Sequence, residues 1–254
     1  MGAVWEREIE AARCAALAAG HFLAVNRDLA HQAAGSAARD VKLKADQEAE
    51  AIILNILSRL APHPVLAEEA GQLGDLSEKD PIWIVDPLDG TVNYSRGMDL
   101  CCISIALYED WTPLLGVVYD FTRRELFMGV TGQGAHCNGQ PIRPSAVRDP
   151  ANAILATGFP VNRNFGAAPL QAFLSQVQSF KKIRLLGSAA LSLAYTACGR
   201  VDAYMEEDIM FYDVAAGMAI AAAAGAWTRI TQSRAKPWAV LAKAGRVWEN
   251  PGSE

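Results

Sequence analysis

The sequence lacks the features that mark membrane proteins, secreted proteins and general nucleic-acid binders. No apolar run approaches the ~18–20 residues that a membrane span needs. Residues 1–17 carry several charges in place of the basic start and apolar core of a signal peptide. The net charge is −5, which gives no reason to expect broad affinity for nucleic acid. We therefore expect a cytoplasmic protein that binds neither membranes nor nucleic acid.

Cysteine and histidine are also scarce and scattered. The five cysteines form no C-x-x-C pair, and their odd number and irregular spacing argue against a disulfide framework and a structural zinc site. None of the four histidines lies in a motif. We expect the cysteines to be small buried residues and the histidines to be structural or surface residues.

Internal repeats and low-complexity linkers are absent too, and the composition is that of a globular protein, with 51% hydrophobic and 20% charged residues. A chain of 254 residues can form one large domain or two small ones. We predict a single compact unit over residues 1–254, with an α+β half at 1–150 and an α/β half at 151–254 that share a large interface.

The first half begins with two predicted helices. Apolar residues recur at helical spacing in residues 4–25, whereas residues 27–41 show no periodicity and predict a mobile loop. The next helix follows Asp46, which could be its N-cap, and ends at Pro62. Its apolar stripe consists of Ala49, Ile52, Ile53, Ile56, Leu57 and Leu60.

Short apolar runs after this helix predict strands. Residues 65–67 and 82–85 form two of them, and the second has no polar alternation, so it should be buried on both faces. Residues 101–107, 114–119 and 125–130 are separated by turn residues and predict an antiparallel meander.

The second half alternates between predicted strands and helices, which is typical of a layered α/β arrangement. The Ala-rich run at residues 215–226 offers almost no polar face and must therefore form a tightly packed helix. The predicted strands are 153–157, 182–186, 201–205 and 226–230, and the predicted helices are 167–179, 189–198 and 213–224.

The strongest chemical signal follows the strand at 82–85. Asp86 and Asp89 come directly after it, and Gly90 and Thr91 complete the turn. Hard divalent cations require several oxygen ligands in a small volume, which two carboxylates and the Leu88 carbonyl could supply. A helix that begins at Thr91 would offer free N–H groups to a phosphate. Taken alone, these residues could equally be an Asp-Pro-x-Asp-Gly surface turn.

Further acidic residues fall where they could join this pair. Glu68 and Glu69 follow the preceding strand just as Asp86 follows its own. Adjacent parallel strands would place both sets at the same edge of a sheet, where ligands bind in α/β proteins. On their own, Glu68 and Glu69 could be a solvated acidic pair, and Asp213 and Asp46 could be helix N-caps.

Taken together, these motifs resemble those of the inositol monophosphatase family. Residues 83–94 fit its first signature, hydrophobic-Asp-Pro-hydrophobic-Asp-Gly-Thr-x-Asn-aromatic, and residues 184–217 fit its second. Residues 44–46 (Lys-Ala-Asp) and 67–71 (Ala-Glu-Glu-Ala-Gly) match two further blocks in the expected order, and the likeness covers about residues 5–225. The resemblance implies an α/β (α+β) fold, the layered αβαβα sandwich of that family, usually in a homodimer.

The resemblance also implies an activity, the Mg²⁺-dependent, lithium-sensitive hydrolysis of a small-molecule phosphate monoester, with about two or three Mg²⁺ ions in each active site. By position, Asp46 and Thr91 would orient the attacking water with support from Glu69. The implied metal ligands are Glu68, Asp86, the Leu88 carbonyl, Asp89 and Asp213.

Substrate contacts are implied in the same way. The backbone of Gly90 and Thr91 resembles the family's phosphate cradle. Bound metal ions lower the pKa of water and neutralise the transferring group, so this division of labour is chemically reasonable. The alcohol part of the substrate would contact Gly187, Ser188, Ala189 and Glu206.

Two departures from the family pattern bear on the substrate. Residues 98–100 (Met-Asp-Leu) stand where the family has an aromatic residue and a proline, and residues 226–227 (Ala-Trp) stand where glycine is usual. We expect a small polyol phosphate, with myo-inositol monophosphate as the substrate. Fructose-1,6-bisphosphatase and 3′(2′),5′-bisphosphate nucleotidase activities are alternatives in the same superfamily. A regulatory binding protein with vestigial phosphatase activity is an alternative of another class.

Overall fold

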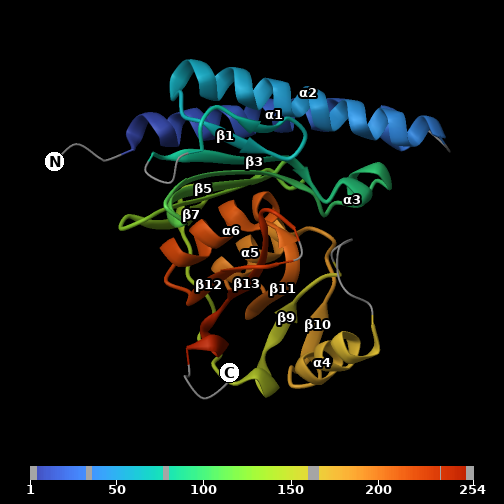
Figure 1. Cartoon of the computed structure of the whole chain (residues 1–254), viewed down its shortest axis with the longest axis vertical. Coiled ribbons are helices and arrows are strands. Elements are labelled where there is room, and N and C mark those ends of the chain that lie inside the picture. Colours follow the sequence, from blue (N-terminus) through green and yellow to red (C-terminus); the bar gives the residue numbers. More distant parts are fainter. Residues whose placement is uncertain (1–4, 33–35, 77–79, 160–165, 235, 250–254) are drawn as a thin grey trace.

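The chain folds into alternating layers of helix and sheet. The computed structural model describes residues 5–32, 36–76, 80–159, 166–234 and 236–249, and of these it describes residues 28–32 and 36–43 by their backbone only. Helices α1 (Glu6–Gln32) and α2 (Ser36–Leu60) cover one face of a large sheet, and α5 (Ala189–Ala197) and α6 (Phe211–Ala223) lie between it and a smaller sheet (Figure 1). Helix α4 (Ala167–Val177) lies on the far side of the smaller sheet (Figure 1). The predicted layered α/β fold is confirmed.

The large sheet has eight strands in the described residues, in the order β2-β1-β3-β4-β5-β6-β7-β8. Strand β1 pairs with β3 in parallel. From β3 to β8, consecutive strands pair antiparallel, so the predicted meander is confirmed. Strands β2, β7 and β8 were not predicted, because glycines and turn residues interrupt the apolar pattern there. The bounds are β1 (Val65–Ala67), β2 (Gly71–Leu73), β3 (Ile82–Asp89), β4 (Cys102–Glu109), β5 (Thr112–Asp120), β6 (Glu125–Val130), β7 (Gly134–Cys137) and β8 (Gln140–Pro141).

The central strands of this sheet are buried on both faces. In β3, Trp83 and Val85 pack among residues of α1 and α2, whereas Ile84 packs toward α5 and α6. In β4, Ile105 and Ala106 divide between the same two sides. The prediction that the strand at 82–85 is buried on both faces is therefore confirmed.

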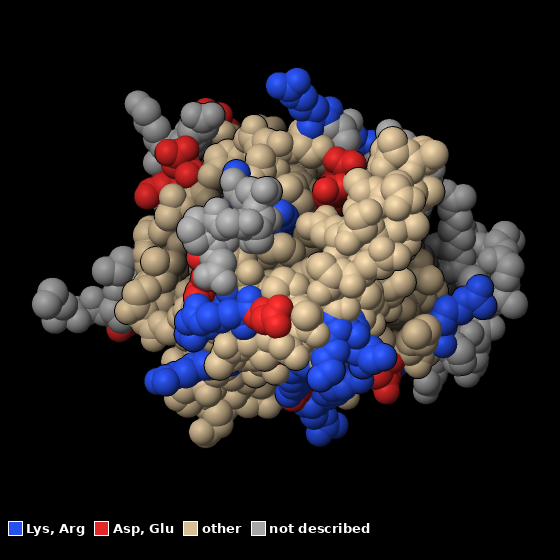
Figure 2. All heavy atoms as spheres, turned by 90° about the horizontal axis from the view of Figure 1, so that it is seen from below, with Lys and Arg blue, Asp and Glu red and all other residues tan. Residues whose placement is uncertain are grey.

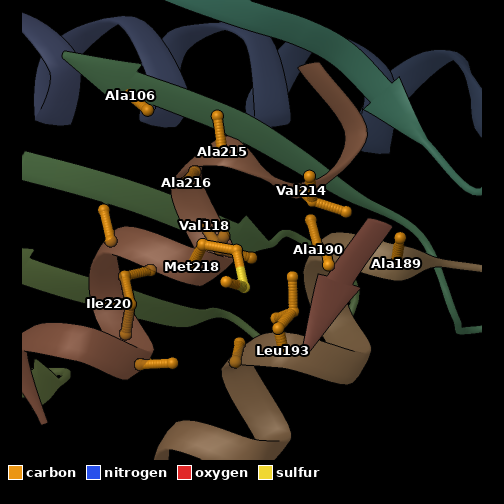
Figure 3. Close-up of a cluster of buried hydrophobic side chains, with 14 of the residues drawn as sticks. Ala106, Val118, Ala189, Ala190, Leu193, Val214, Ala215, Ala216, Met218 and Ile220 are labelled. Carbon is orange, nitrogen blue, oxygen red and sulfur yellow. The ribbon is translucent and has the colours of Figure 1, made fainter. Parts of the chain in front are cut away.

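Small residues let α6 lie directly on the large sheet (Figure 3). A Cβ atom added to Gly116 of β5 would lie 2.4 Å from the carbonyl oxygen of Ala216. A Cβ atom added to Gly129 of β6 would lie 2.6 Å from the Cα atom of Ile220. The predicted tight packing of the Ala-rich helix is confirmed, and it fixes the first turn of α6, which contains Asp213, against the sheet.

The smaller sheet has five strands in the described part of the chain, in the order β10-β9-β11-β13-β12. Strands β10, β9 and β11 are parallel, and β13 pairs antiparallel with β11 and β12. Strand β13 was not predicted, because its Ala-rich sequence has little strand propensity. The bounds are β9 (Ile154–Ala156), β10 (Lys182–Arg184), β11 (Ala203–Met210), β12 (Thr228–Gln232) and β13 (Ala239–Ala244).

The helical layer of α1 and α2 corrects one prediction. The loop predicted at residues 27–41 is wrong in the described residues, because α1 continues to residue 32 and α2 begins at residue 36. Residues 27–32 contain Arg, Leu, Ala and Gln, which favour helix, and no Gly or Pro. The predicted helix start at residue 4 and the loop residues 33–35 lie outside the described residues. None of the described helices is both long enough and apolar enough to cross a membrane.

Two acidic residues do not occupy the N-cap positions that the sequence allowed for them. Asp46 lies inside α2 with its side chain buried, on the same face as Glu50. Helix α6 begins at Phe211, so Asp213 lies in its first turn and is not the N-cap. Neither carboxylate is therefore explained by capping its helix.

Candidate active site

Two parallel strands bring the first acidic residues together. Strands β1 and β3 pair with Ala67 opposite Val85, and the backbone N–H of Glu68 donates to the Val85 carbonyl at 3.1 Å. Glu68 and Asp86 therefore lie side by side at the same edge of the sheet, as predicted for two adjacent parallel strands. In agreement with this, Glu68 is among the groups that raise the pKa of Asp86, after the larger effect of burial.

The turn after Asp86 brings the backbone close to the same edge. The pairing of β3 with β4 is interrupted between Asp86 and Asp89, and the Leu88 N–H donates to Asp86 Oδ1 at 2.9 Å. Gly90 has a φ of 84°, and an added Cβ atom would lie 2.6 Å from a backbone carbonyl oxygen, so glycine alone fits. Helix α3 (Thr91–Ser95) begins there as predicted, and the Thr91 hydroxyl donates to the Leu88 carbonyl at 3.0 Å.

The N-terminus of α5 holds Asp89. The Ser188 hydroxyl donates to Asp89 Oδ2 at 2.5 Å, and the Ala190 N–H donates to the same oxygen at 2.7 Å. The Ala189 N–H donates to Oδ1 at 3.3 Å. Ser188 is also the N-cap of α5 and accepts from the N–H of Leu191 at 3.3 Å. A residue of the first half is thus oriented by a helix of the second half.

Asn93 makes a second connection between the halves. Its Nδ2 donates to the Leu186 carbonyl at 2.8 Å and to the Leu100 carbonyl at 2.7 Å. The side chain is buried beside Gly187, whose φ of 70° suits glycine. Sequence reasoning gave Asn93 no role, although a buried amide between two turns often joins them by such bonds.

These elements surround a pocket with two lobes. The acidic lobe, with a volume of about 200 Å³, is lined by Glu68, Asp86, Leu88, Asp89, Gly90, Thr91, Val92, Gly187 and Asp213. The wide lobe, with a volume of about 510 Å³, shares three of the acids and adds the predicted substrate contacts Ser188, Ala189 and Glu206. Of the predicted site residues, only Asp46 and Glu69 line neither of these two lobes.

Like charges are crowded in the acidic lobe. Burial holds the pKa of Asp86 well above its ordinary value, and the charges of Glu68 and Asp89 raise it further. Burial, together with the charges of Asp89 and Glu68, has the same effect on the pKa of Asp213. Burial also raises the pKa of Asp89, but hydrogen bonds from the start of α5 oppose this rise. A bound cation would relieve the repulsion.

Of the two predicted catalytic residues outside the pocket lining, Asp46 lies in helix α2 and Glu69 lies next to it. Glu69 is exposed, and its backbone N–H donates to Glu50 Oε2 at 3.0 Å. Asp46 is buried near Tyr94 of α3. Burial raises the pKa of Tyr94 to about 12, and the charge of Asp46 is one of the smaller causes of this rise.

Glu50 also accepts the Ala70 N–H at 2.9 Å, so it fixes the backbone that follows Glu68. Sequence reasoning missed Glu50, whose signal is an acid within the apolar stripe of its helix.

An irregularity in β11 places Glu206 at the wide lobe. The strand continues to residue 210, past its predicted end at 205, and its pairing with β13 shifts between Glu206 and Ile209. The Tyr204 hydroxyl donates to Glu206 Oε2 at 3.0 Å. Gly158 makes room for this carboxylate, because an added Cβ atom would lie 2.5 Å from Glu206 Oε1. The loop that contains Gly158 and Phe159 was not predicted to line the site.

The acidic lobe fits a hard divalent cation by the chemistry of its donor atoms. Four carboxylates and the Leu88 carbonyl line it, and no described histidine or cysteine does. Such oxygen donors suit Mg²⁺ and not softer metals. Among the residues that the structure describes, no group of three or more His, Cys or acidic side chains is arranged to hold a metal ion as it stands. The fit therefore lies in the donor types, their common lobe and their raised pKa values.

The fold and the pocket together define a class: a layered α/β protein with an acidic, oxygen-lined pocket between its two sheets. The model of the inositol monophosphatase family matches residues 5–252. An inositol-1-monophosphatase of Synechocystis sp. is 40% identical over 195 residues, which cover 74% of this chain and 66% of that protein. The Nus factor SuhB of Escherichia coli K12 is 36% identical, over 83% of this chain and 80% of its own. The structure of inositol monophosphatase from Anabaena sp. PCC 7120 has a TM-score of 0.81 and 35% identity, over 94% of this chain and 91% of that one.

The chain therefore belongs to the inositol monophosphatase family, a family of phosphatases, and the resemblance of its motifs is confirmed. The match spans just under two thirds of the length of the Synechocystis relative.

Proposed function

We propose that this protein is a Mg²⁺-dependent phosphomonoesterase that acts on a small polyol phosphate, with myo-inositol monophosphate as its substrate. The observation that carries the proposal is the convergence of four carboxylates and the Gly90 turn in one lobe. Family membership supports the same reaction class, since the Synechocystis relative is named an inositol-1-monophosphatase.

The acidic lobe would hold Mg²⁺ through Glu68, Asp86, Asp89, Asp213 and the Leu88 carbonyl. When bound, Mg²⁺ supplies charge neutralisation on the phosphoryl group and acidifies the attacking water. Because carboxylate ligands must be deprotonated, and burial raises the pKa of several of them, cation binding should release protons.

The neighbouring residues would orient the reactants. The N–H groups at Gly90 and Thr91 would contact the phosphate, because the glycine lets the backbone approach closely. The Thr91 hydroxyl donates its proton to the Leu88 carbonyl, so its oxygen can accept a hydrogen bond from the attacking water. Asp46 would support this arrangement through α3, against which α2 packs, and Glu69 would support it from the exposed side.

Phosphate release with and without Mg²⁺ tests the proposal. Wild-type protein, Asp86→Asn and the exposed control Glu109→Gln are assayed on inositol 1-phosphate in Mg²⁺ and in excess chelator. We expect turnover only with Mg²⁺, inhibition by Li⁺ and Ca²⁺, and a loss of more than about 100-fold in kcat for Asp86→Asn. Full turnover in chelator would refute the metal mechanism.

Glu206 supports a polyol over the bisphosphate alternatives. Its carboxylate can accept hydrogen bonds from hydroxyl groups and would repel a second phosphate. The test compares kcat/KM for inositol 1-phosphate, fructose 1,6-bisphosphate and 3′-phosphoadenosine 5′-phosphate in the wild type and in Glu206→Gln. The proposal requires the largest loss on inositol 1-phosphate, and equal losses on all three would leave Glu206 without a role in selection.

A second candidate function is partner binding. The E. coli relative is named a Nus factor, and Figure 2 shows Lys and Arg side chains gathered on the face seen from below. Exposed Lys181, Lys182 and Arg184 lie around β10, in that half of the molecule. A basic face attracts polyanions, so titration with an RNA oligonucleotide tests this role and, with it, the expectation that the protein binds no nucleic acid. A Lys181→Glu, Lys182→Glu double variant is titrated beside the wild type. Binding that the charge reversal abolishes while phosphate release persists would support it, and no binding by the wild type would reject it.

We also propose that the protein is cytoplasmic, since residues 1–17 lack a signal peptide, and that it forms the homodimer that the resemblance implies. Sedimentation equilibrium of the purified protein checks the oligomeric state, with a monomer mass at micromolar concentration as the contrary result. Fractionation of the source cells checks the location.

A further inference from the structure

The wide lobe has an apolar side that a polyol would not use. Val92 is 67% exposed and Phe159 is 44% exposed, and both line this lobe. Ile209 and Met210, from the end of β11, line it as well. Ligand pockets are lined mostly by apolar and aromatic side chains, with a few polar groups that orient the ligand.

This apolar side begins next to the acids. Val92 directly follows Thr91, and Tyr212, which also lines the wide lobe, directly precedes Asp213. A substituent on the alcohol of a phosphate ester held in the acidic lobe would therefore meet these side chains.

Phe159 is supported from behind. Its ring packs against that of Phe173 in α4, with the two centroids 4.7 Å apart. A ring held in this way offers a preorganised surface for an aromatic group, which packs well in tilted or offset geometry.

A polyol is poorly matched to this side of the lobe. Its hydroxyl groups would lose water against Val92 and Phe159 without gaining hydrogen bonds, which is unfavourable. The volume of about 510 Å³ is also in the range that holds ligands larger than a six-carbon polyol phosphate.

We propose that the site also accepts phosphate monoesters whose alcohol carries an aromatic group, with the phosphate in the acidic lobe and the aromatic group against Val92 and Phe159. This inference rests on the proposed phosphatase function and adds a substrate class to the polyol phosphates named there. Hydroxyl groups elsewhere on the same alcohol would still meet Glu206.

Matched esters test the proposal. The enzyme is assayed with Mg²⁺ on 2-phenylethyl phosphate and ethyl phosphate, whose leaving groups are both primary alcohols. The binding of 3-phenylpropylphosphonate and propylphosphonate, which cannot be hydrolysed, is measured by calorimetry. The variants are Val92→Thr, which keeps the shape of the side chain, and Phe159→Ala, and thermal melting confirms that each folds. Val25→Thr is the control, because Val25 in α1 is 66% exposed and does not line the pocket.

We expect the phenyl group to raise kcat/KM and phosphonate affinity by at least about 10-fold in the wild type and in Val25→Thr. Phe159→Ala should lower this ratio by about 3–10-fold and leave ethyl phosphate little changed, and Val92→Thr should lower the same ratio. Equal values for the phenyl and alkyl compounds would overturn the inference even if inositol 1-phosphate is hydrolysed. Selective phosphonate binding without turnover of any ester would instead reject the proposed function and keep the aromatic site.

Discussion

The contact between α6 and the large sheet can be tested by adding one methyl group. In Gly116→Ala, the new Cβ atom would lie 2.4 Å from the carbonyl oxygen of Ala216 and 2.9 Å from the Cβ atom of Ala219. The oxygen belongs to a buried helical turn and cannot move alone, so α6 must move away from β5. Overpacking of this kind costs about 1–3 kcal/mol, which lowers the Tm of a chain of this size by about 2–12 °C.

The same substitution should disturb the active site. Asp213 lies in the first turn of α6, whereas Asp86 belongs to β3 of the sheet, so a shift of the helix changes the separation of two proposed ligands. Misplacement of about 1 Å can cost about 100-fold in rate. We expect Gly116→Ala to lower kcat by about 10–100-fold and to raise the Mg²⁺ concentration at half-maximal activity.

The assays are thermal melting and Mg²⁺-dependent phosphate release, with Gly20→Ala as the matched control. Gly20 packs α1 on the opposite face of the sheet, where an added Cβ atom would lie 2.5 Å from the ring of Tyr119. That ring is a partly exposed side chain and can turn, so the control should lose less stability and keep its Mg²⁺ dependence. An unchanged Tm in Gly116→Ala, or an equal loss of kcat in Gly20→Ala, would refute the reasoning.

Three further outcomes are expected. Asp86→Asn should leave the Tm of the metal-free protein unchanged or higher, because one of several crowded carboxylates is removed. Calorimetry in chelator measures this Tm, and a large fall would contradict the prediction. The pKa values of Asp86 and Asp213 are higher in the folded than in the unfolded chain, so the folded metal-free protein binds extra protons. Its stability should therefore fall as the pH rises above about 4, where the unfolded chain loses these protons first. Thermal melts across pH check this, and saturating Mg²⁺ should remove the loss. Glu50→Ala should destabilise the protein by about 1–3 kcal/mol, because the backbone N–H groups of Glu69 and Ala70 lose their acceptor. It should also lower kcat. Glu50→Gln should recover part of the stability and part of kcat, as denaturation and activity assays would show.

Elements buried on both sides were predictable from local sequence. The strand around Trp83 and the helix around Ala216 are apolar throughout because neither has a face to expose. The meander was predictable because turn residues separate its apolar runs. The proximity of Glu68 and Asp86 followed from the same patterns, since parallel neighbouring strands place the residues that follow them at one edge.

Local sequence could not predict contacts between distant segments. The bonds from Ala190 to Asp89 and from Asn93 to Leu186 join residues far apart in the chain, and neither end has a periodic pattern that points to the other. The loop predicted at residues 27–41 failed for another reason. The ends of α1 and α2 that approach each other project past the sheet (Figure 1), so the segment forms helix without the apolar stripe that burial imposes.

The environment of Asp89 explains why the site depends on both halves of the chain. Burial raises the pKa of this carboxyl, whereas the Ser188 hydroxyl and the N–H groups at the start of α5 favour its charged form, as does the positive end of the helix dipole. Oδ2 takes the two short bonds, at 2.5 and 2.7 Å, and Oδ1 takes the longer bond of 3.3 Å from Ala189, so Oδ1 is the oxygen better placed to bind a cation. Separating α5 from β3 would remove both the charge stabilisation and the orientation of this proposed ligand. Mg²⁺ affinity should therefore report the contact between the two halves, which local sequence left unspecified.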